Sequence, residues 1–301
     1  MKGATRKTLM LIMTVTLCVS TILVLGQHID YLQAQQSYVQ AQDAVRDNPT
    51  EAPPMENEPV KLPSEPEAPL LEDPEVPLTE VPDVPAELGE PEQNPLEEQA
   101  FYLKDLDLGE LRKTNSDVVC WISIPGTQLD YPVLQGEDNQ YYLKRTWQGK
   151  QNSAGSIFLE CKVRNDFSDF NTLIYGHNMK NGSMFGSLRQ YRTQSHYEAN
   201  PYIYIADDGG IRRYEIFSAF EAEVTGYTYR LDINTVEKKQ ALLDYSLERS
   251  VIRTGIVPVP EDAIITLSTC TGNGYDTRWV VQAVLTGYFP VWETEAPEAE
   301  H

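Results

Sequence analysis

A stretch rich in proline and acidic residues, 49–98, constrains the fold of this chain more than any other feature. It holds 13 of the 20 prolines and 15 acidic residues, against one basic residue, Lys61. Each proline removes a backbone donor and the carboxylates repel one another, so this stretch cannot build a packed core. It therefore separates an N-terminal part from a folded part that begins near Gln99 and is long enough for one well-buried core.

The same stretch accounts for most of the acidic balance. It contributes −14 of the formal net charge of −21. The acidic balance argues against nucleic-acid binding, which needs basic patches. Fully extended at about 3.1 Å per residue, the stretch would reach on the order of 150 Å. We therefore predict a spacer that could cross a thick polymer layer, with charge repulsion from a membrane surface as an alternative role.

The N-terminus predicts a membrane anchor. Basic residues precede an apolar run from Leu9 to Gly26, whose length nearly matches a hydrocarbon core of roughly 30 Å. Basic residues before the run place the N-terminus in the cytoplasm and the rest of the chain outside. We predict a cytoplasmic tail over 1–7 and a single-pass transmembrane anchor over 8–26. A cleaved signal peptide is the alternative, although its apolar region is usually shorter.

A polar segment joins the anchor to the linker. Ile29, Leu32 and Val39 recur in it at helical spacing, which predicts a short juxtamembrane helix. We therefore assign 27–98 to this helix and the acidic linker together.

Beyond Gln99 the pattern is mainly β, and we assign 99–290 to one domain and 291–301 to a C-terminal tail. Helical spacing is limited to an amphipathic stretch from Phe101 to Leu111 and to short pieces at 139–145, 183–191 and 235–249. Many short strands with few helices predict a closed or nearly closed barrel. The predicted strands are Val118–Ile124, Tyr131–Leu134, Gly155–Leu159, Thr172–Tyr175, Tyr202–Ala206, Arg212–Val224, Ile264–Leu267 and Trp279–Tyr288.

Cys270 is the first candidate for chemistry. It follows the buried strand Ile264–Leu267, where the backbone leaves the core, and Arg278 opens the next strand. A hairpin would hold this thiol and this guanidinium at one edge of a sheet. The alternative is a cysteine packed as a small hydrophobe and an arginine at a solvated strand end.

The other three cysteines predict no chemistry. Cys18 lies in the apolar run, whereas Cys120 and Cys161 lie in strand-like segments, where buried free thiols are expected. A Cys120–Cys161 disulfide is the alternative. The chain has neither the CxxC nor the His-rich spacing of a zinc site.

His177 is the second candidate, because it follows the apolar strand that ends at Tyr175 and Gly176. A free thiol with a pKa near 8.5 needs a nearby base or cation to act as a nucleophile. The other histidines lie beside the anchor, in a polar loop and at the last residue. Arg278 cannot serve as a base, but it can stabilise the oxyanion of a tetrahedral intermediate. A satisfied loop histidine is the alternative reading of His177.

These segments together resemble the sortase family. Thr266–Cys270 is similar to its TLxTC signature, Tyr175–Met179 to the YGHNM block of class B, and Arg278–Val281 to the R-[FW]-V-V strand. The connection from Cys270 to Arg278 is short and glycine-rich, whereas related proteins often carry a longer acidic loop there. This difference affects the expected shape of the rim of the substrate groove. Supporting similarity runs through Trp121–Thr127, Tyr131–Gln135, Asp138–Leu143 and Asn200–Ile205.

The resemblance implies an eight-stranded sortase-type β-barrel with an N-terminal helix and a few peripheral helices. It implies a class B cysteine transpeptidase of a Gram-positive-type cell surface, with no metal or cofactor. Cys270 would attack the carbonyl after threonine in a C-terminal sorting signal, with His177 and Arg278 assisting. The resulting thioacyl group would pass to a peptidoglycan precursor amine.

The resemblance also implies a substrate groove lined by Asn139, Leu143, Ser268 and Thr269, with ordinary helix and strand packing as the alternative. Two other functions stay open. One is a pilin-polymerising sortase that joins subunits through a lysine. The other is an inactive surface-binding barrel.

Overall fold

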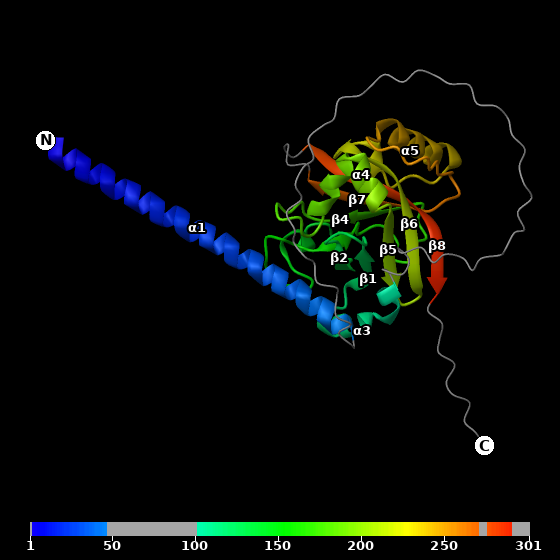
Figure 1. Ribbon diagram of the computed structural model, residues 1–301, viewed down its shortest axis with the longest axis horizontal. Helices are drawn as coiled ribbons and strands as arrows, with labels where there is room; N and C mark the ends of the chain where they lie inside the picture. Colours follow the sequence, from blue (N-terminus) through cyan, green and yellow to red (C-terminus); the bar gives the residue numbers. More distant parts are fainter. Residues whose placement is uncertain (1, 47–100, 271–275, 291–301) are drawn as a thin grey trace, which may run out of the picture.

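A closed barrel of eight strands forms the centre of the molecule (Figure 1). The computed structural model describes residues 2–46, 101–270 and 276–290. Around the barrel the strand order is β1-β2-β3-β4-β7-β8-β6-β5, which confirms the predicted eight-stranded barrel. The bounds are β1 Val118–Ser123, β2 Asp130–Leu134, β3 Ile157–Leu159, β4 Asn171–Tyr175, β5 Tyr202–Asp207, β6 Gly210–Glu223, β7 Ile264–Cys270 and β8 Thr277–Pro290.

The pairing of the strands explains where the two candidate segments lie. β4 and β7 are adjacent and parallel, and β8 pairs antiparallel with β7 on its other side. The only other parallel pair among the described strands is β2 with β3. Strands β4 and β7 are buried along nearly their whole length, as their runs of Leu, Ile and Thr require.

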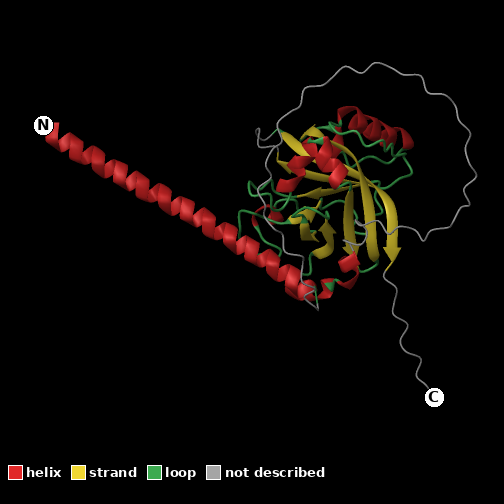
Figure 2. Ribbon diagram, in the orientation of Figure 1, coloured by secondary structure: helices red, strands yellow, loops and turns green. Residues whose placement is uncertain are grey.

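Short helices cover the outside of the barrel (Figure 2). The helix predicted near Phe101–Leu111 is broken, because Leu106 forms a β-bridge with Arg46 and Asp107 starts a new helix by accepting a hydrogen bond from Gly109 N. The sequence did not predict α4. The bounds are η1 Phe101–Asp105, α3 Leu108–Thr114, η2 Tyr141–Lys144, η3 Gly186–Arg192, α4 Gln194–Ala199, η4 Tyr227–Tyr229 and α5 Val236–Arg249.

A single long helix, α1 (Lys2–Val45), runs from the N-terminus to the barrel. Its first half extends away from the barrel (Figure 1), and the side chains from Met13 to Leu25 are exposed. By length and composition, this helix is able to cross a membrane. Its last turns pack on the barrel and bury Ala34, Tyr38, Ala41 and Val45.

The docked part of α1 uses a face that the sequence pattern did not indicate. Ile29, Leu32 and Val39, whose spacing predicted the helix, are about half exposed. The buried face consists of small residues, which allow the helix to approach the barrel closely, together with Tyr38 and Val45, which belong to the same hydrophobic core as the strands. The folded unit therefore includes part of the segment that we assigned to the juxtamembrane helix.

The described residues on the two sides of the acidic linker are paired with each other. Arg46, at the end of α1, forms a β-bridge with Leu106, and Asp107 N donates to Val45 O at 3.1 Å. The linker itself and the C-terminal tail lie outside the described residues. Because its flanks are paired, the linker does not set the distance between the anchor and the barrel, and the predicted spacer role is corrected. Helix α1 sets that distance.

Candidate active site

The backbone register places Cys270 directly opposite Arg278. Cys270 is the last residue of β7 and pairs with Arg278 near the start of β8. This hairpin forms because both strands carry β-branched and apolar residues and close around the segment 271–275, which lies outside the described residues. The Arg278 side chain is half-buried and donates from Nη1 to Thr277 O at 2.8 Å. The thiol and guanidinium positions thus share one edge of the barrel, as the sequence predicted.

His177 reaches the same edge from the other side of β7. Tyr175, the last residue of β4, pairs with Ser268, and Gly176 N donates to Ser268 O at 3.2 Å. Since β4 and β7 run parallel, two further residues along each strand bring the chain to His177 and Cys270. The β7 strand end is therefore flanked by the histidine position on one side and by Arg278 on the other.

The His177 ring is held against the backbone of a neighbouring turn. Its Nε2 lies 2.6 Å from Leu143 O. Because a carbonyl oxygen only accepts, Nε2 carries the proton in this arrangement and Nδ1 is left for proton exchange. Gly155, at φ +60°, lies beneath: a Cβ there would be 2.8 Å from His177 Cδ2 and 2.7 Å from Leu143 O. Only glycine permits this close approach.

The loop after His177 is tied down at several points. Phe185 N donates to His177 O at 3.0 Å, and Asn178 forms a β-bridge with Met184. Met184 is buried with φ +54°, an uncommon conformation for a side chain of this size. Its N–H donates to the Tyr131 hydroxyl at 3.3 Å. Such strain persists only where surrounding contacts hold it.

Helix α1 supplies some of those contacts. The Tyr38 ring packs edge-on against Tyr131 at 5.2 Å, and its hydroxyl donates to Gly155 O at 2.6 Å. Asn181 Nδ2 donates to the Tyr31 hydroxyl at 2.8 Å. The docked helix therefore contacts both Gly155, beneath the His177 ring, and the loop that follows His177.

Ser268 and Thr269, two of the predicted groove residues, are buried. Ser268 Oγ is 2.8 Å from the Tyr229 hydroxyl, whereas Thr269 Oγ1 has no hydrogen-bond partner among the described residues. Tyr229 comes from η4, in the connection between β6 and α5, and no sequence pattern indicated its role. Neither side chain is open to solvent in this structure.

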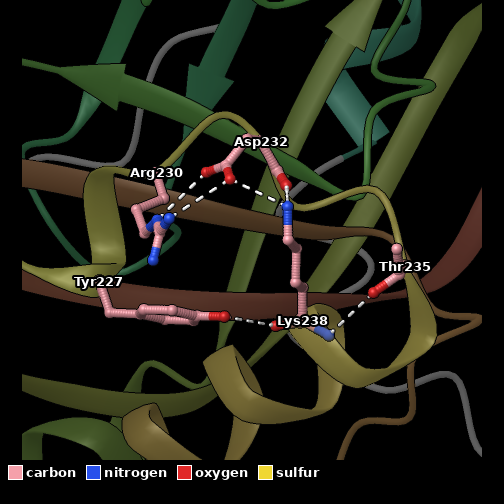
Figure 3. Close-up of polar contacts among 5 residues, drawn as sticks. All are labelled: Tyr227, Arg230, Asp232, Thr235 and Lys238. Atoms are coloured by element: carbon pink, nitrogen blue, oxygen red, sulfur yellow. Dashed lines mark hydrogen bonds and ion pairs between the residues drawn. The ribbon is translucent and has the colours of Figure 1, made fainter.

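A network at the start of α5 fixes the connection that carries Tyr229 (Figure 3). Asp232 accepts hydrogen bonds from Arg230 and from Lys238, and the Tyr227 hydroxyl donates to Lys238 O at 3.2 Å. Thr235 caps the helix by accepting from Lys238 N. These exposed ion pairs are individually weak, but together they restrict the loop.

Asn139 and Leu143, the other two predicted groove residues, have contacts within the fold. Asn139 donates to the buried Glu160 carboxylate at 2.6 Å and accepts from Cys161 N at 2.8 Å. Leu143 is 38% exposed, so its side chain is free to contact a ligand. Their substrate contacts stay predictions, and Asn139 would have to exchange its present partners to make one.

Glu160 and Tyr175 form a polar cluster that sequence reasoning missed. The Tyr175 hydroxyl donates to Glu160 Oε2 at 3.1 Å, one strand away from Ser268. Burial, and then the Glu160 charge, raise the pKa of Tyr175, so it stays a neutral donor at neutral pH. Glu160 and Tyr175 are 15 positions apart in the sequence. Glu160 follows β3 and Tyr175 ends β4, so the pairing of these two strands brings them together.

Cys120 and Cys161 have environments unsuited to a nucleophile. Cys120 is buried, and burial raises the pKa of its thiol well above the usual value. Desolvation, and then the neighbouring Glu160, raise the pKa of the Cys161 thiol. Both are free thiols rather than partners in a disulfide. A reactive thiolate needs the opposite environment.

Comparison with known proteins agrees with this barrel. The sortase domain model matches residues 122–286. Sortase B of Listeria monocytogenes is 38% identical over 183 residues, which cover 60% of this chain and 74% of the relative.

Solved structures give the same result. The Staphylococcus aureus sortase B–substrate complex has a TM-score of 0.57 and 33% identity, and the match covers 60% of this chain and 84% of the other. Clostridium perfringens sortase B has a TM-score of 0.57 and 29% identity, over 60% of this chain and 100% of the other.

The fold and the matched segments define a cysteine transpeptidase class. The chain belongs to the sortase family, and within it to class B. Its enzyme activity is that of a sortase transpeptidase.

Proposed function

We propose that this enzyme cleaves a C-terminal sorting signal after threonine and transfers the released protein to a cell-wall peptidoglycan amine. The observation that carries the proposal is the register that sets the Cys270 position between Arg278 on β8 and the His177 position beyond β4. Nucleophile, proton carrier and oxyanion donor are the three roles that acyl transfer from a thiol requires.

The reaction proceeds in two acyl transfers. The Cys270 thiolate attacks the threonine carbonyl carbon, and Arg278 stabilises the tetrahedral oxyanion. The peptide C–N bond then breaks as the His177 imidazolium protonates the leaving amine, which leaves a thioacyl enzyme. An incoming amine loses its proton to His177 and attacks the thioester, and the thiolate departs.

The same proposal includes a single-pass membrane location with the catalytic domain outside a Gram-positive-type cell. It is supported by the apolar first half of α1, which follows the basic residues of the N-terminus. The substrates would be surface proteins that carry the signal, and the acceptor a peptidoglycan precursor.

For the signal itself, class B resemblance favours the Asn-Pro-x-Thr-Asn or Ser/Pro-Pro-x-Thr-Gly kind over Leu-Pro-x-Thr-Gly. Proline pre-bends the peptide, so the groove need not supply that ordering entropy. The residue before proline would meet the turn from Asn139 to Leu143, where a polar side chain is expected to be preferred.

The proposal is tested by mass spectrometry of the products formed from a peptide library with an amine acceptor. Library members vary at the residue before proline, and the acceptors are a peptidoglycan-type peptide amine and a pilin-type lysine peptide. We expect cleavage after threonine and transfer to the first acceptor. Preferred transfer to the lysine peptide would establish the pilin-polymerising alternative, and no cleavage of any member would refute the proposal.

A further inference from the structure

The residues that follow His177 form a hollow lined by basic side chains. It has a volume of about 440 Å³ and contains three basic side chains and no carboxylate among its lining residues. It is lined by Lys180, Asn181, Gly182, Gly186, Arg189, Gln190 and Arg192.

The hollow has a firm floor and ordered arginines. A Cβ at Gly186 would lie 2.3 Å from Met179 O, so the two backbones of the loop are in direct contact. Arg192 places its guanidinium 4.7 Å from the centre of the Trp279 ring, and Arg189 Nε donates to Gly186 O at 3.3 Å.

No described carboxylate forms an ion pair with these basic side chains, Lys180, Arg189 and Arg192. Arginine and lysine left without a carboxylate partner in a concave site favour an anionic ligand, above all a phosphate.

Hydrogen bonds to helix α1 hold the hollow near the end of the proposed membrane span. Asn181, one of the lining residues, donates to the Tyr31 hydroxyl at 2.8 Å, and Asn152 Nδ2 donates to Asp30 O at 2.7 Å. Residues 30 and 31 follow the apolar run, which ends at Gly26, by four and five positions, so they lie about 6–8 Å beyond it along the helix axis. The headgroup layer on each side of a bilayer is about 5–8 Å thick. These loops therefore lie at headgroup level.

We propose that this hollow binds the phosphate of an anionic membrane-lipid headgroup. The inference rests on the proposed transmembrane role of α1, and charge complementarity selects the occupant, because clustered basic residues beside a membrane span attract anionic lipids. Bound lipid would hold the loop that carries His177 at the membrane surface, where a lipid-linked acceptor or an anchored substrate is also held.

The test measures binding by the full-length protein in neutral-detergent micelles, using calorimetric titration with monomeric dihexanoyl phosphatidylglycerol. Lys180→Glu with Arg189→Glu should weaken the binding at least tenfold, since each basic residue near such a surface contributes several-fold. Arg189→Gln alone should weaken it about threefold. The matched control is Lys238→Glu with Arg249→Glu on α5, which lies well away from α1 (Figure 1) and carries the same charge change; it should bind as the wild type does.

Binding of free phosphates distinguishes a lipid site from a general anion site. Inorganic phosphate and pyrophosphate should bind at least tenfold more weakly than the lipid; equal affinity would replace the lipid site by a free-anion site and overturn the proposal. Equal binding by the two double variants, or no lipid binding by wild type, would also overturn it. Because no arm requires turnover, these results are independent of whether sorting-signal transfer is observed.

Discussion

At the scale of single residues, the position of the His177 ring depends on a glycine rather than on the side chain of a second functional residue. Gly155 has φ +60°, and its missing Cβ leaves room for both the ring and Leu143 O. The same residue's carbonyl accepts from Tyr38 on α1. Gly155 therefore connects the docked helix to the candidate catalytic histidine.

Gly155→Ala should lower transpeptidation at least tenfold, because the new methyl group displaces the His177 ring or the 142–143 backbone. Overpacking of this kind also destabilises by about 1–3 kcal/mol. Gly255→Ala is the matched control: it has a similar φ of +75° but nothing within 4 Å of its Cβ. Steady-state rates and thermal unfolding compare the two variants. If both keep full activity, Gly155 does not position His177.

Sequence patterns indicated the candidate residues for chemistry but not the residues that hold them in place. His177 and Cys270 stand out because each follows an apolar strand. Gly155, Glu160, Tyr175 and Tyr229 act through partners that lie far along the chain or on another strand, for example Tyr229 with Ser268, 39 residues away. Such contacts depend on strand pairing, which local spacing does not encode.

At the scale of elements, the strands were predictable and the docking of α1 was not. Alternating and β-branched runs predicted all eight strands, because each buries one or both faces in the barrel. The docked face of α1 contains alanines and one tyrosine in a polar sequence, so it carries little apolar signal. Its partners, such as Tyr131 and Gly155, are visible only in the folded molecule.

Tyr38→Ala should destabilise the protein by about 3 kcal/mol, since it removes a buried aromatic ring from the interface between α1 and the barrel. It also removes the hydroxyl that bonds Gly155 O, so a several-fold loss of activity should accompany it. The neighbouring Val39 is 48% exposed, and Val39→Ala should change unfolding free energy by less than about 0.5 kcal/mol. Denaturant unfolding of the full chain in detergent measures both. Equal effects would mean that α1 does not dock.

The docking also changes what is expected of truncated proteins. The folded part predicted from the sequence begins near Gln99, yet a chain that begins there lacks Tyr38, Ala41 and Val45 of the shared core. We now expect a chain that begins near Gln27 to unfold at a higher temperature than one that begins at Gln99. Thermal unfolding of both measures this, and identical midpoints would show that α1 contributes nothing to the core.

At the scale of the whole molecule, α1 joins the apolar N-terminal segment to the barrel, and the described residues on the two sides of the acidic linker lie side by side. Arg46 and Leu106 are bridged, so the length of the linker is irrelevant to the reach of the barrel. The composition of the linker predicted that it would not pack, but could not predict where its ends meet.

Replacing residues 49–98 with about six Gly and Ser residues should therefore leave peptide cleavage unchanged and raise stability by about 1 kcal/mol, because a shorter loop costs less entropy to close. Unfolding and cleavage by the full-length protein and the shortened one are compared in the same detergent. Lower stability or lost cleavage would show that the linker has contacts or a role that the pairing of its ends does not reveal.

The proposed function requires that acyl transfer runs through Cys270. The most direct measurement is mass-spectrometric mapping of the covalent adduct formed when the full-length enzyme meets a sorting-signal peptide without an acceptor amine. We predict a thioacyl group on Cys270 alone, lost when hydroxylamine or an acceptor amine is added and absent from Cys270→Ala. An adduct on Cys120 or Cys161, or turnover by Cys270→Ala, would contradict the claim.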